Sequence, residues 1–326
     1  MTAPIKGALA ALMSFAFFSS HDALVKSLGG AISVFQIVFF SVLFGFPLVM
    51  LMLIRDRAEG TLRPRHPWLV GLRTLLAVTT SFGAFYAFTS LPLSQVYSII
   101  FAQPLLITAL SVPLLGESVG WRRWIAVLVG LIGVMIVLDP RNADLQWGHL
   151  AALIAAFGGA VVSIILRKIG GEERSAVLIL YPMLANFACM GLALPFVYVA
   201  PSGVQLATLA AIALFSFGGM LMMILAYRIA PAAIVAPMQY SQIIWAALLG
   251  ALFFMEFPTW NTAVGAGVII AAGLYIVARE RSGGRSQTTP VSGSRTPRGD
   301  TAPGLRAGDV LRMRDAANRP LRSDPE

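Results

Sequence analysis

The chain has 326 residues, of which 57% are hydrophobic and 12% are charged, and its mean hydropathy is +0.78. A soluble protein of this length needs many more charged side chains to cover its surface, so the composition excludes soluble enzymes and nucleic-acid-binding modules. The net charge of +9 is typical of the basic loops of a membrane protein, and we expect no nucleic-acid partner. The single cysteine, Cys189, excludes a disulfide framework and a cysteine-based metal site.

Apolar runs long enough to cross a bilayer, roughly 20 residues each, recur ten times along the chain. We predict membrane-spanning helices at residues 8–28, 32–54, 67–89, 92–115, 121–138, 148–167, 176–200, 204–227, 231–255 and 259–278. Most loops between them are short, and the runs contain Gly, Ala and Ser, which let helices pack closely. The sequence therefore predicts an all-α integral membrane protein with ten transmembrane helices in the lipid bilayer.

The basic residues of the predicted loops gather on one side of the membrane. That side holds Lys6, Arg55, Arg57, Arg63, Arg65, Arg122, Arg123, Arg167, Lys168, Arg174, Arg228, Arg279, Arg281 and Arg285. The opposite side holds Lys26 and Arg141. Because basic loops remain in the cytoplasm, we expect both termini to be cytoplasmic and the membrane to be a bacterial inner membrane. Residues 281–326, rich in Gly, Ser, Thr, Pro and Arg, are predicted to be a disordered cytoplasmic tail.

The two halves of the apolar region repeat each other. At an offset of 139 residues, spans four and five match spans nine and ten, pairing Pro92 with Pro231, Val96 with Val235, Gln103 with Gln242, Glu117 with Glu256, and Trp121 with Trp260. At an offset of 141, the run 9–12 matches 150–153, and Lys26 matches Arg167. Each unit has five spans, so the second copy enters the membrane from the opposite side. We predict two inverted five-helix repeats, at residues 5–140 and 147–280.

The run from Leu91 to Glu117, LPLSQVYSIIFAQPLLITALSVPLLGE, followed by WRRWIAVLVGLIGVMIVLDP, resembles the EamA-type domain of the drug/metabolite transporter superfamily. The second copy, from Ala230 to Glu280, has the matching pattern of Pro, small residues and Glu. The resemblance implies a ten-helix secondary transporter with a central substrate cavity between its halves. It also implies that the inner spans, and not spans five and ten, line that cavity.

One position departs from this family pattern. Relatives often carry Arg in the middle of span two, where this sequence reads Phe39, Phe40 and Ser41. A substrate contact or gating role for that Arg therefore does not carry over to this chain.

Polar residues at membrane depth are the first candidates for a transport path, because each must be paired or face a water-filled cavity. The predicted substrate-binding residues are Tyr97, Ser98 and Gln103 in span four and Gln239, Gln242 and Trp245 in span nine. Amide and indole groups side by side suit a planar, polar ligand. Gln103 and Gln242 are repeat equivalents, so we expect them to approach each other across the pseudo-symmetry axis. The alternative is that each Gln bonds a neighbouring helix carbonyl and only holds the bundle together.

His21, Asp22 and Lys26 cluster in the outer half of span one, where Asp22 and Lys26 have the spacing of a pair on one helix face. His21 and Asp22 are the candidate coupling residues, because a buried Asp or His can carry a proton across the membrane. The alternative is an ion pair at the helix end, with Lys26 reaching the lipid headgroups.

Other polar residues are weaker candidates. Arg73 suits an anionic substrate or an interface position, and packing roles are expected for Tyr86, Tyr181, Asn186 and Tyr227. Glu117 and Glu256, each shortly before a Trp, are predicted to anchor helix ends at the membrane surface. His66 and His149 lie near loops on opposite sides, and we expect neither a metal site nor a cofactor.

These features predict a carrier that moves a small organic metabolite by alternating access, with the proton as a candidate coupling ion. The segment SSHDALVKSLGG and the run after Leu91 look most similar to family members that take up riboflavin or S-adenosylmethionine. Within the class, the alternative is an exporter of amino acids, drugs or toxic metabolites. Outside it, a non-transporting membrane subunit remains open. A membrane-embedded enzyme requires converging charged groups, and the embedded charges here are few and scattered.

Overall fold

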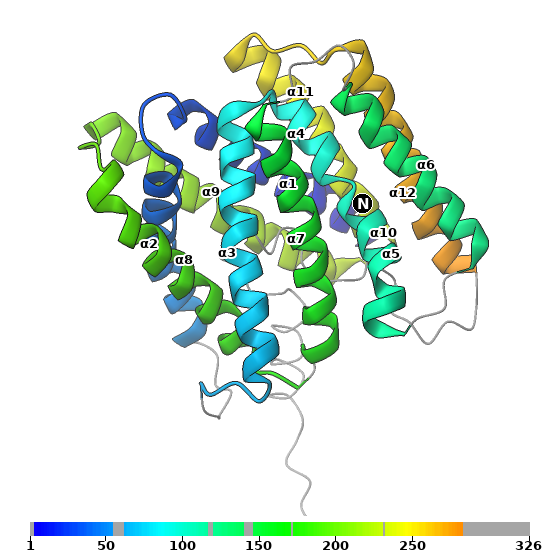
Figure 1. Cartoon of the computed structure of the whole chain (residues 1–326), viewed down its shortest axis with the longest axis horizontal. Coiled ribbons are helices and arrows are strands. Elements are labelled where there is room, and N and C mark those ends of the chain that lie inside the picture. The colour runs from blue at the N-terminus through cyan, green and yellow to red at the C-terminus, as the bar shows by residue number, and fades with distance from the viewer. Residues whose placement is uncertain are drawn as a thin grey trace, which may run out of the picture.

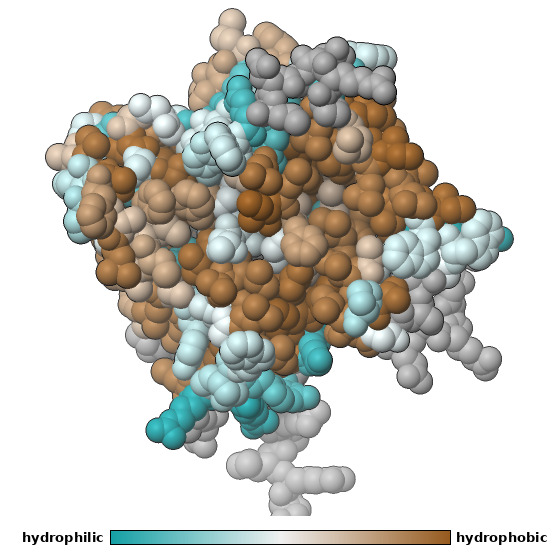
Figure 2. Space-filling view, viewed as in Figure 1, coloured by the Kyte–Doolittle hydropathy of each residue, from teal (hydrophilic) through white to brown (hydrophobic). Residues whose placement is uncertain are grey.

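The computed structural model describes residues 3–54, 62–116, 120–139, 146–170, 172–230 and 232–282, and the described chain is helical apart from its turns and loops. Eight of its helical segments are long and apolar enough to cross a membrane. The hydrophobic surface is broad, and in the view of Figure 2 the hydrophilic residues gather mainly toward its upper and lower ends. This distribution suits a protein surrounded by lipid around its middle and by water at both ends.

Eight of the ten predicted spans each form one continuous helix. These are α1 (Ala3–Leu28), α2 (Val34–Ile54), α3 (Pro67–Ser90), α6 (Trp121–Leu138), α7 (Trp147–Ile169), α8 (Ser175–Val197), α9 (Gly203–Ile229) and α12 (Trp260–Ser282). Their bounds lie within a few residues of the prediction, because loop residues and Pro or Gly positions stop the apolar runs. The predicted tail lies outside the described residues from residue 283 onward, as do Glu117 and Arg141.

Spans four and nine are broken helices, which the apolar pattern did not predict. Span four divides into α4 (Leu93–Ile100) and α5 (Gln103–Leu115), and span nine into α10 (Ala232–Val235), the 3₁₀ segment η1 (Ala236–Tyr240) and α11 (Ser241–Phe254). Pro104 and Pro237 lie within the first two positions of α5 and η1. Proline has no N–H to donate to the preceding turn, so each interrupts the helical ladder. The two prolines are not repeat equivalents, but the breaks meet at equivalent positions, because α4 ends just before Phe101 and η1 ends at Tyr240.

The packing follows the inverted repeat, with α1 to α6 in the first copy and α7 to α12 in the second. The first helix of each copy packs mainly on the third span of the other, α1 on α9 and α7 on α3. In the same way α11 packs on α1, and α5 packs on α7. The equivalent helices α2 and α8 contact each other, as do α6 and α12. Figure 1 shows α6 and α12 side by side at one edge of the bundle.

Glycine allows the closest of these approaches. A Cβ at Gly83 of α3 would lie 2.8 Å from the carbonyl oxygen of Ala151 in α7, and one at Gly265 of α12 would lie 2.6 Å from that of Gly133 in α6. Only a residue without a side chain fits at such a crossing, as in other membrane helix pairs. The Gly content of the spans is therefore used where the two repeats touch.

The ends of α5 and α11 show the repeat in the backbone. Gly116 follows α5 with φ of 68°, and its repeat equivalent, Met255, follows α11 with φ of 55°. Both residues turn the chain in the left-handed conformation that ends many helices. Glycine adopts it without strain, whereas methionine does so at an energetic cost, and Met255 directly precedes Glu256.

Candidate functional site

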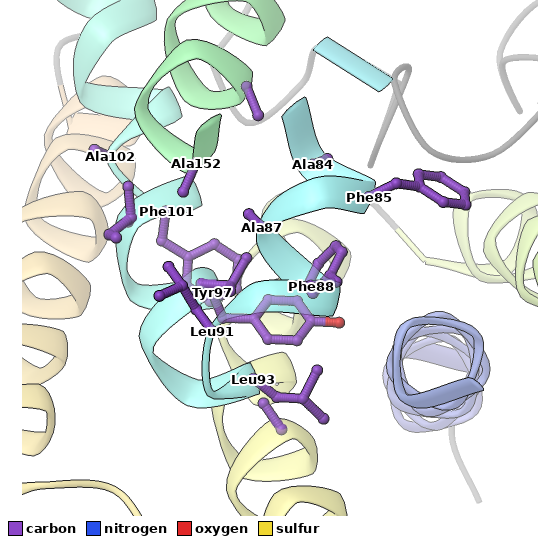
Figure 3. Close-up of a cluster of buried hydrophobic side chains, with 14 of the residues drawn as sticks. Ala84, Phe85, Ala87, Phe88, Leu91, Leu93, Tyr97, Phe101, Ala102 and Ala152 are labelled. Carbon is purple, nitrogen blue, oxygen red and sulfur yellow. The ribbon is translucent and has the colours of Figure 1, made fainter. Parts of the chain in front are cut away.

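A buried acidic cluster links the first helix of the bundle to α4. Asp22 of α1 is 0% exposed, and its Oδ1 lies 2.8 Å from Nδ1 of His21, which is 2% exposed. The Tyr97 hydroxyl of α4 donates to Oδ2 of Asp22 and also lies 3.3 Å from the Ser19 hydroxyl oxygen. In Figure 3, Tyr97 lies near Phe88, Leu91 and Leu93, with its hydroxyl at the edge of this apolar cluster. Tyr97 therefore joins the predicted binding residues to the predicted coupling pair.

Asp22 is the one carboxylate within the described segments that meet the criteria for crossing a membrane. A buried carboxylate is expensive unless it is paired and hydrogen-bonded, and His21 and Tyr97 supply those partners. The His21 ring also meets the edge of Phe85, with centroids 5.7 Å apart.

A row of aromatic rings runs from this cluster to the second repeat. Centroid distances are 5.5 Å from Phe88 to Tyr97, 5.9 Å from Tyr97 to Phe101, and 5.5 Å from Phe101 to Tyr240. Phe101 and Tyr240 are repeat equivalents at the offset of 139, so their edge-to-face contact lies on the pseudo-symmetry axis. The sequence prediction missed this pair. The same offset that aligned Gln103 with Gln242 also aligns these two aromatic residues, and it was the available signal.

Gln242 is the predicted binding residue with an unsatisfied group. It lies in the first turn of α11, is 3% exposed, and its side-chain amide nitrogen has no hydrogen-bond partner among the residues that the structure describes. Gln239 is half-buried in the 3₁₀ segment before it. Trp245 is also half-buried and packs against the apolar cluster between α1 and α9. An amide donor left free at this depth suits a ligand or a water molecule as its missing partner.

Gln103 and Ser98 are engaged with helices. The Gln103 amide donates to the hydroxyl of Ser163 in α7 at 3.4 Å and lies against Gly159, where a Cβ would approach it to 3.0 Å. Ser98 is fully buried and donates to the carbonyl oxygen of Ser94 at 2.7 Å. Gln103 lies on α5, which packs on α7, whereas Gln242 lies on α11, which packs on α1. The residues that meet across the axis are Phe101 and Tyr240, two positions before the two glutamines.

The weaker candidates mostly make local contacts. Arg73 is buried, and its Nη1 donates to the carbonyl oxygen of Leu178 in α8 at 2.7 Å. The Asn186 amide donates to the Pro182 carbonyl at 3.0 Å within its own helix. Ser41, which stands where relatives often have Arg, donates to the Ile37 carbonyl at 2.7 Å. These groups stabilise helices and helix contacts.

Glu256 has a different role from the predicted surface anchor. Its Oε1 lies 2.8 Å from Nζ of Lys26, so Lys26 forms an ion pair with the second repeat. The two side chains are 24% and 10% exposed, respectively. Spacing along one helix favoured Asp22 as the partner of Lys26, and sequence spacing gives no information about a partner on a distant loop. On the same side, His149 Nε2 lies 3.0 Å from the amide of Gln95.

A shallow apolar groove lies elsewhere, between α3, α7 and α8. Its volume is about 550 Å³, and its lining includes Phe82, Tyr86, Trp147, Leu150 and Met190. Leu150 and Trp147 are exposed on the outside of the bundle. The groove therefore opens on the surface that faces lipid.

Known proteins match this chain along most of its length. An S-adenosylmethionine uptake transporter of Rickettsia felis is 30% identical over 83% of this chain and 92% of the relative. A riboflavin transporter of Rhizobium johnstonii is 28% identical over 74% and 78%. The pseudopaline exporter CntI of Pseudomonas aeruginosa is 26% identical over 85% and 97%.

Fold and family comparisons agree. One solved crystal structure, 21% identical, has a TM-score of 0.57 and covers 85% of this chain and 98% of its own, which supports the fold alone. The model of the EamA-like transporter family matches residues 5–139 and again residues 146–278. The two matches cover the apolar region almost from end to end. The chain therefore belongs to the EamA-like transporter family, with two copies of the family domain.

Proposed function

We propose that this protein is a secondary transporter that takes up a cofactor-like metabolite of the S-adenosylmethionine class by alternating access. The observation that carries the proposal is the buried Asp22, a carboxylate at membrane depth beside a row of aromatic rings. An organic cation with a planar base needs both features, a counter-charge and ring faces. The similarity to the Rickettsia uptake transporters adds independent support.

The proposed binding region lies between the two broken spans. Asp22 is the counter-charge for the cation, the rings of Tyr97, Phe101 and Tyr240 contact the planar base, and the free amide of Gln242 donates to it. Broken helices at equivalent positions of the two repeats are typical of transporter binding sites. Gln239, Trp245, Ser98 and Gln103 are then residues of the surrounding wall.

Riboflavin is the second candidate substrate. Its flat ring system suits the same aromatic row, and a riboflavin transporter is among the relatives. Riboflavin has no positive charge, however, and gives Asp22 no electrostatic role in binding. Export is the other direction to test, since a pseudopaline exporter shares 26% identity with this chain.

We also propose an orientation. The basic residues of the loops support a cytoplasmic position for Lys6 and both termini, with the protein in a bacterial inner membrane, and the end that holds Lys26 and Glu256 then faces outward. His21 and Asp22 are proposed to couple transport to the proton, because they share one hydrogen-bonded site within the membrane. We assign transport alone, with no catalytic role.

Uptake into liposomes tests these assignments. Purified protein is reconstituted, and the entry of radiolabelled S-adenosylmethionine and of riboflavin is measured with and without an imposed proton gradient. The proposal expects saturable S-adenosylmethionine uptake that exceeds riboflavin uptake and responds to the gradient. Saturable riboflavin uptake without S-adenosylmethionine uptake would favour the second candidate. Equal S-adenosylmethionine uptake with and without the gradient would remove the proton from the mechanism.

A further inference from the structure

The ion pair between Lys26 and Glu256 connects three separate parts of the bundle. Lys26 lies in the last turn of α1, Glu256 lies in the loop between α11 and α12, and both contact the junction of α3 and α4. There Lys26 donates to the carbonyl oxygen of Leu91 at 2.6 Å, and the Leu93 N–H donates to Glu256 Oε2 at 3.4 Å. One pair of charges thus holds elements of both repeats together at one end of the protein.

Each charge also suits the helix end that it contacts. Lys26 binds the carbonyl of Leu91, the residue that caps the C-terminus of α3, where a positive charge is favourable. Glu256 accepts from the first N–H of α4, where a negative charge is favourable. The pair is mostly shielded from solvent, so its attraction is screened less than that of an exposed surface pair.

The pair lies one helical turn beyond the acidic cluster. On α1, Asp22 and Lys26 are four residues apart and share a face, and on α4, Leu93 and Tyr97 have the same spacing. The contact between α1 and α4 is therefore made twice, by Asp22 with Tyr97 and then by the Lys26–Glu256 pair at Leu93. Along α1 and α4, the pair therefore lies between that end of the bundle and Asp22.

The α4 helix is a short unit that ends in a turn. It has eight residues, and before α5 the Ala102 N–H donates to the carbonyl oxygen of Ile99, three residues back, while Pro104 has no N–H to continue the ladder. Its first turn is held from two sides by the second repeat, by Glu256 at Leu93 and by His149 at Gln95. A hinge at one end and releasable polar contacts at the other are the parts that a closing element needs.

We propose that Lys26 and Glu256 form the outer gate of the transporter, and that opening it frees the first turn of α4 and gives water and substrate access to Asp22. The gate regulates the site of the proposed function and rests on it for the identity of the substrate. The structure is then the outward-closed state. Breaking the pair shifts the population toward the open state.

Chemical labelling tests the gate without any substrate. In a Cys189→Ser background, Ser19→Cys places a thiol beside Tyr97, and a charged, membrane-impermeant thiol reagent is added from outside to intact cells. Lys26→Ala and Glu256→Ala are each expected to raise the labelling rate about tenfold. The double variant should match the singles, because both substitutions remove the same contact.

The matched control is Asn261→Ala. It removes the 2.7 Å hydrogen bond from Asn261 to Asp139, which links the α12 and α6 side at the same end of the bundle. Its labelling rate should equal that of the parent. If Asn261→Ala raises the labelling rate as much as Lys26→Ala does, both substitutions loosen the packing of the whole bundle end, and the assignment of the gate to Lys26 and Glu256 is wrong.

A second reporter and a cross-link keep the result clear if Ser19→Cys does not fold. Ala23→Cys lies one turn from Ser19 on the same face and should show the same rate changes.

Cross-linking tests the gate in the closed direction. A reducible bifunctional thiol reagent that joins Lys26→Cys to Glu256→Cys should stop uptake, and reduction should restore it. Unchanged labelling in both charge variants, or faster labelling only in inverted vesicles, would overturn the gate.

The two proposals fail separately. If the labelling rates rise as expected but S-adenosylmethionine is not taken up, the gate stands and the substrate is wrong. If uptake is present but the labelling rates do not change, the transporter function stands and the gate lies elsewhere.

Discussion

The equivalent helices α1 and α7 have the same packing partners in opposite repeats but very different side chains. Both are central, α1 against α9 and α11, and α7 against α3 and α5. The offset of 141 aligns Ser14, Ser19, His21 and Asp22 of α1 with Ala155, Ala160, Val162 and Ser163 of α7. The polar groups of α1 are thus replaced by mostly apolar ones. The two copies therefore share their helix packing, but at these four positions the polar side chains are concentrated in the first copy.

The contacts made by Asp22 and Ser163 show what this difference does. Asp22 binds His21 and the hydroxyl of Tyr97, forming a buried site that can hold charge. Ser163 accepts from the Gln103 amide and donates to the Gly159 carbonyl at 2.8 Å, contacts that fasten α5 to α7. The first helix of one repeat therefore carries the residues of the proposed site, and the equivalent polar residue of the other makes contacts between helices.

The strongest test of this difference between α1 and α7 is to neutralise Asp22. Asp22→Asn keeps the shape of the side chain but removes the proposed counter-charge, and losing one partner of a buried charge pair in a complex typically costs ~2–5 kcal/mol of binding free energy. Because 1.4 kcal/mol is tenfold, we expect uptake at low substrate concentration to fall by roughly thirtyfold or more and its proton-gradient dependence to disappear. The control is Ser163→Ala, which should keep uptake within about twofold of the parent. Equal losses in both would mean that the two copies share the function.

Removing one hydroxyl tests the link between α1 and α4. Tyr97→Phe keeps the aromatic row and deletes the hydrogen bond to Asp22, and hydrogen bonds to charged groups contribute ~1.5–3 kcal/mol. We expect initial uptake rates to fall about tenfold while the amount of folded protein in the membrane stays constant. Tyr275→Phe, the same change on the exposed face of α12, should have no effect. A normal rate for Tyr97→Phe would reduce Tyr97 to a packing residue.

Substitutions of the two repeat-related glutamines should also have different effects, one on substrate binding and the other on stability. Gln242→Ala removes a buried amide whose nitrogen has no hydrogen-bond partner in the described part of the chain, so the loss falls on the substrate, and we expect its KM to rise roughly fivefold. Gln103→Ala removes a contact to α7 and should lower thermal stability with a smaller change in KM. Uptake kinetics and a thermal-unfolding assay in detergent measure both. A larger KM change for Gln103→Ala would reverse these roles.

The smallest expected effect concerns packing at Tyr240. A Cβ at Gly273 of α12 would lie 1.9 Å from the Tyr240 hydroxyl oxygen, so Gly273→Ala forces the ring to shift. Overpacking typically costs ~1–3 kcal/mol, and the melting temperature should fall by several degrees. Adding Tyr240→Phe removes the clashing oxygen and should recover part of the loss. No recovery in the double variant would show that the backbone of α12 is displaced and not the ring.

Most of the architecture could be predicted because lipid restricts the chain to a few simple patterns. Length and apolar runs were enough to predict the spans α1 to α3, α6 to α9 and α12, and the matching offsets predicted the repeat. The breaks in spans four and nine were missed. Hydropathy is unaffected by a broken ladder, and Pro104 and Pro237 by themselves signal a kink as readily as a break.

The candidate site was predicted in pieces. Asp22, His21, Tyr97 and Gln242 were all selected as polar residues at membrane depth, but the contact between Asp22 and Tyr97 depends on how α1 crosses α4. The partner of Lys26 was missed because Glu256 lies far along the chain, in a loop that follows a left-handed turn at Met255. Pairs of this kind follow from tertiary packing, which a single sequence does not specify.

The contact between Phe101 and Tyr240 has a further consequence for the transport cycle. When two inverted halves exchange conformations, each contact is replaced by its repeat equivalent. A contact between equivalent residues is replaced by itself, so we expect Phe101 and Tyr240 to remain together through the cycle. The equivalent helices that touch, α2 with α8 and α6 with α12, should also stay in contact, and together with the aromatic pair they mark the line about which the two halves would turn.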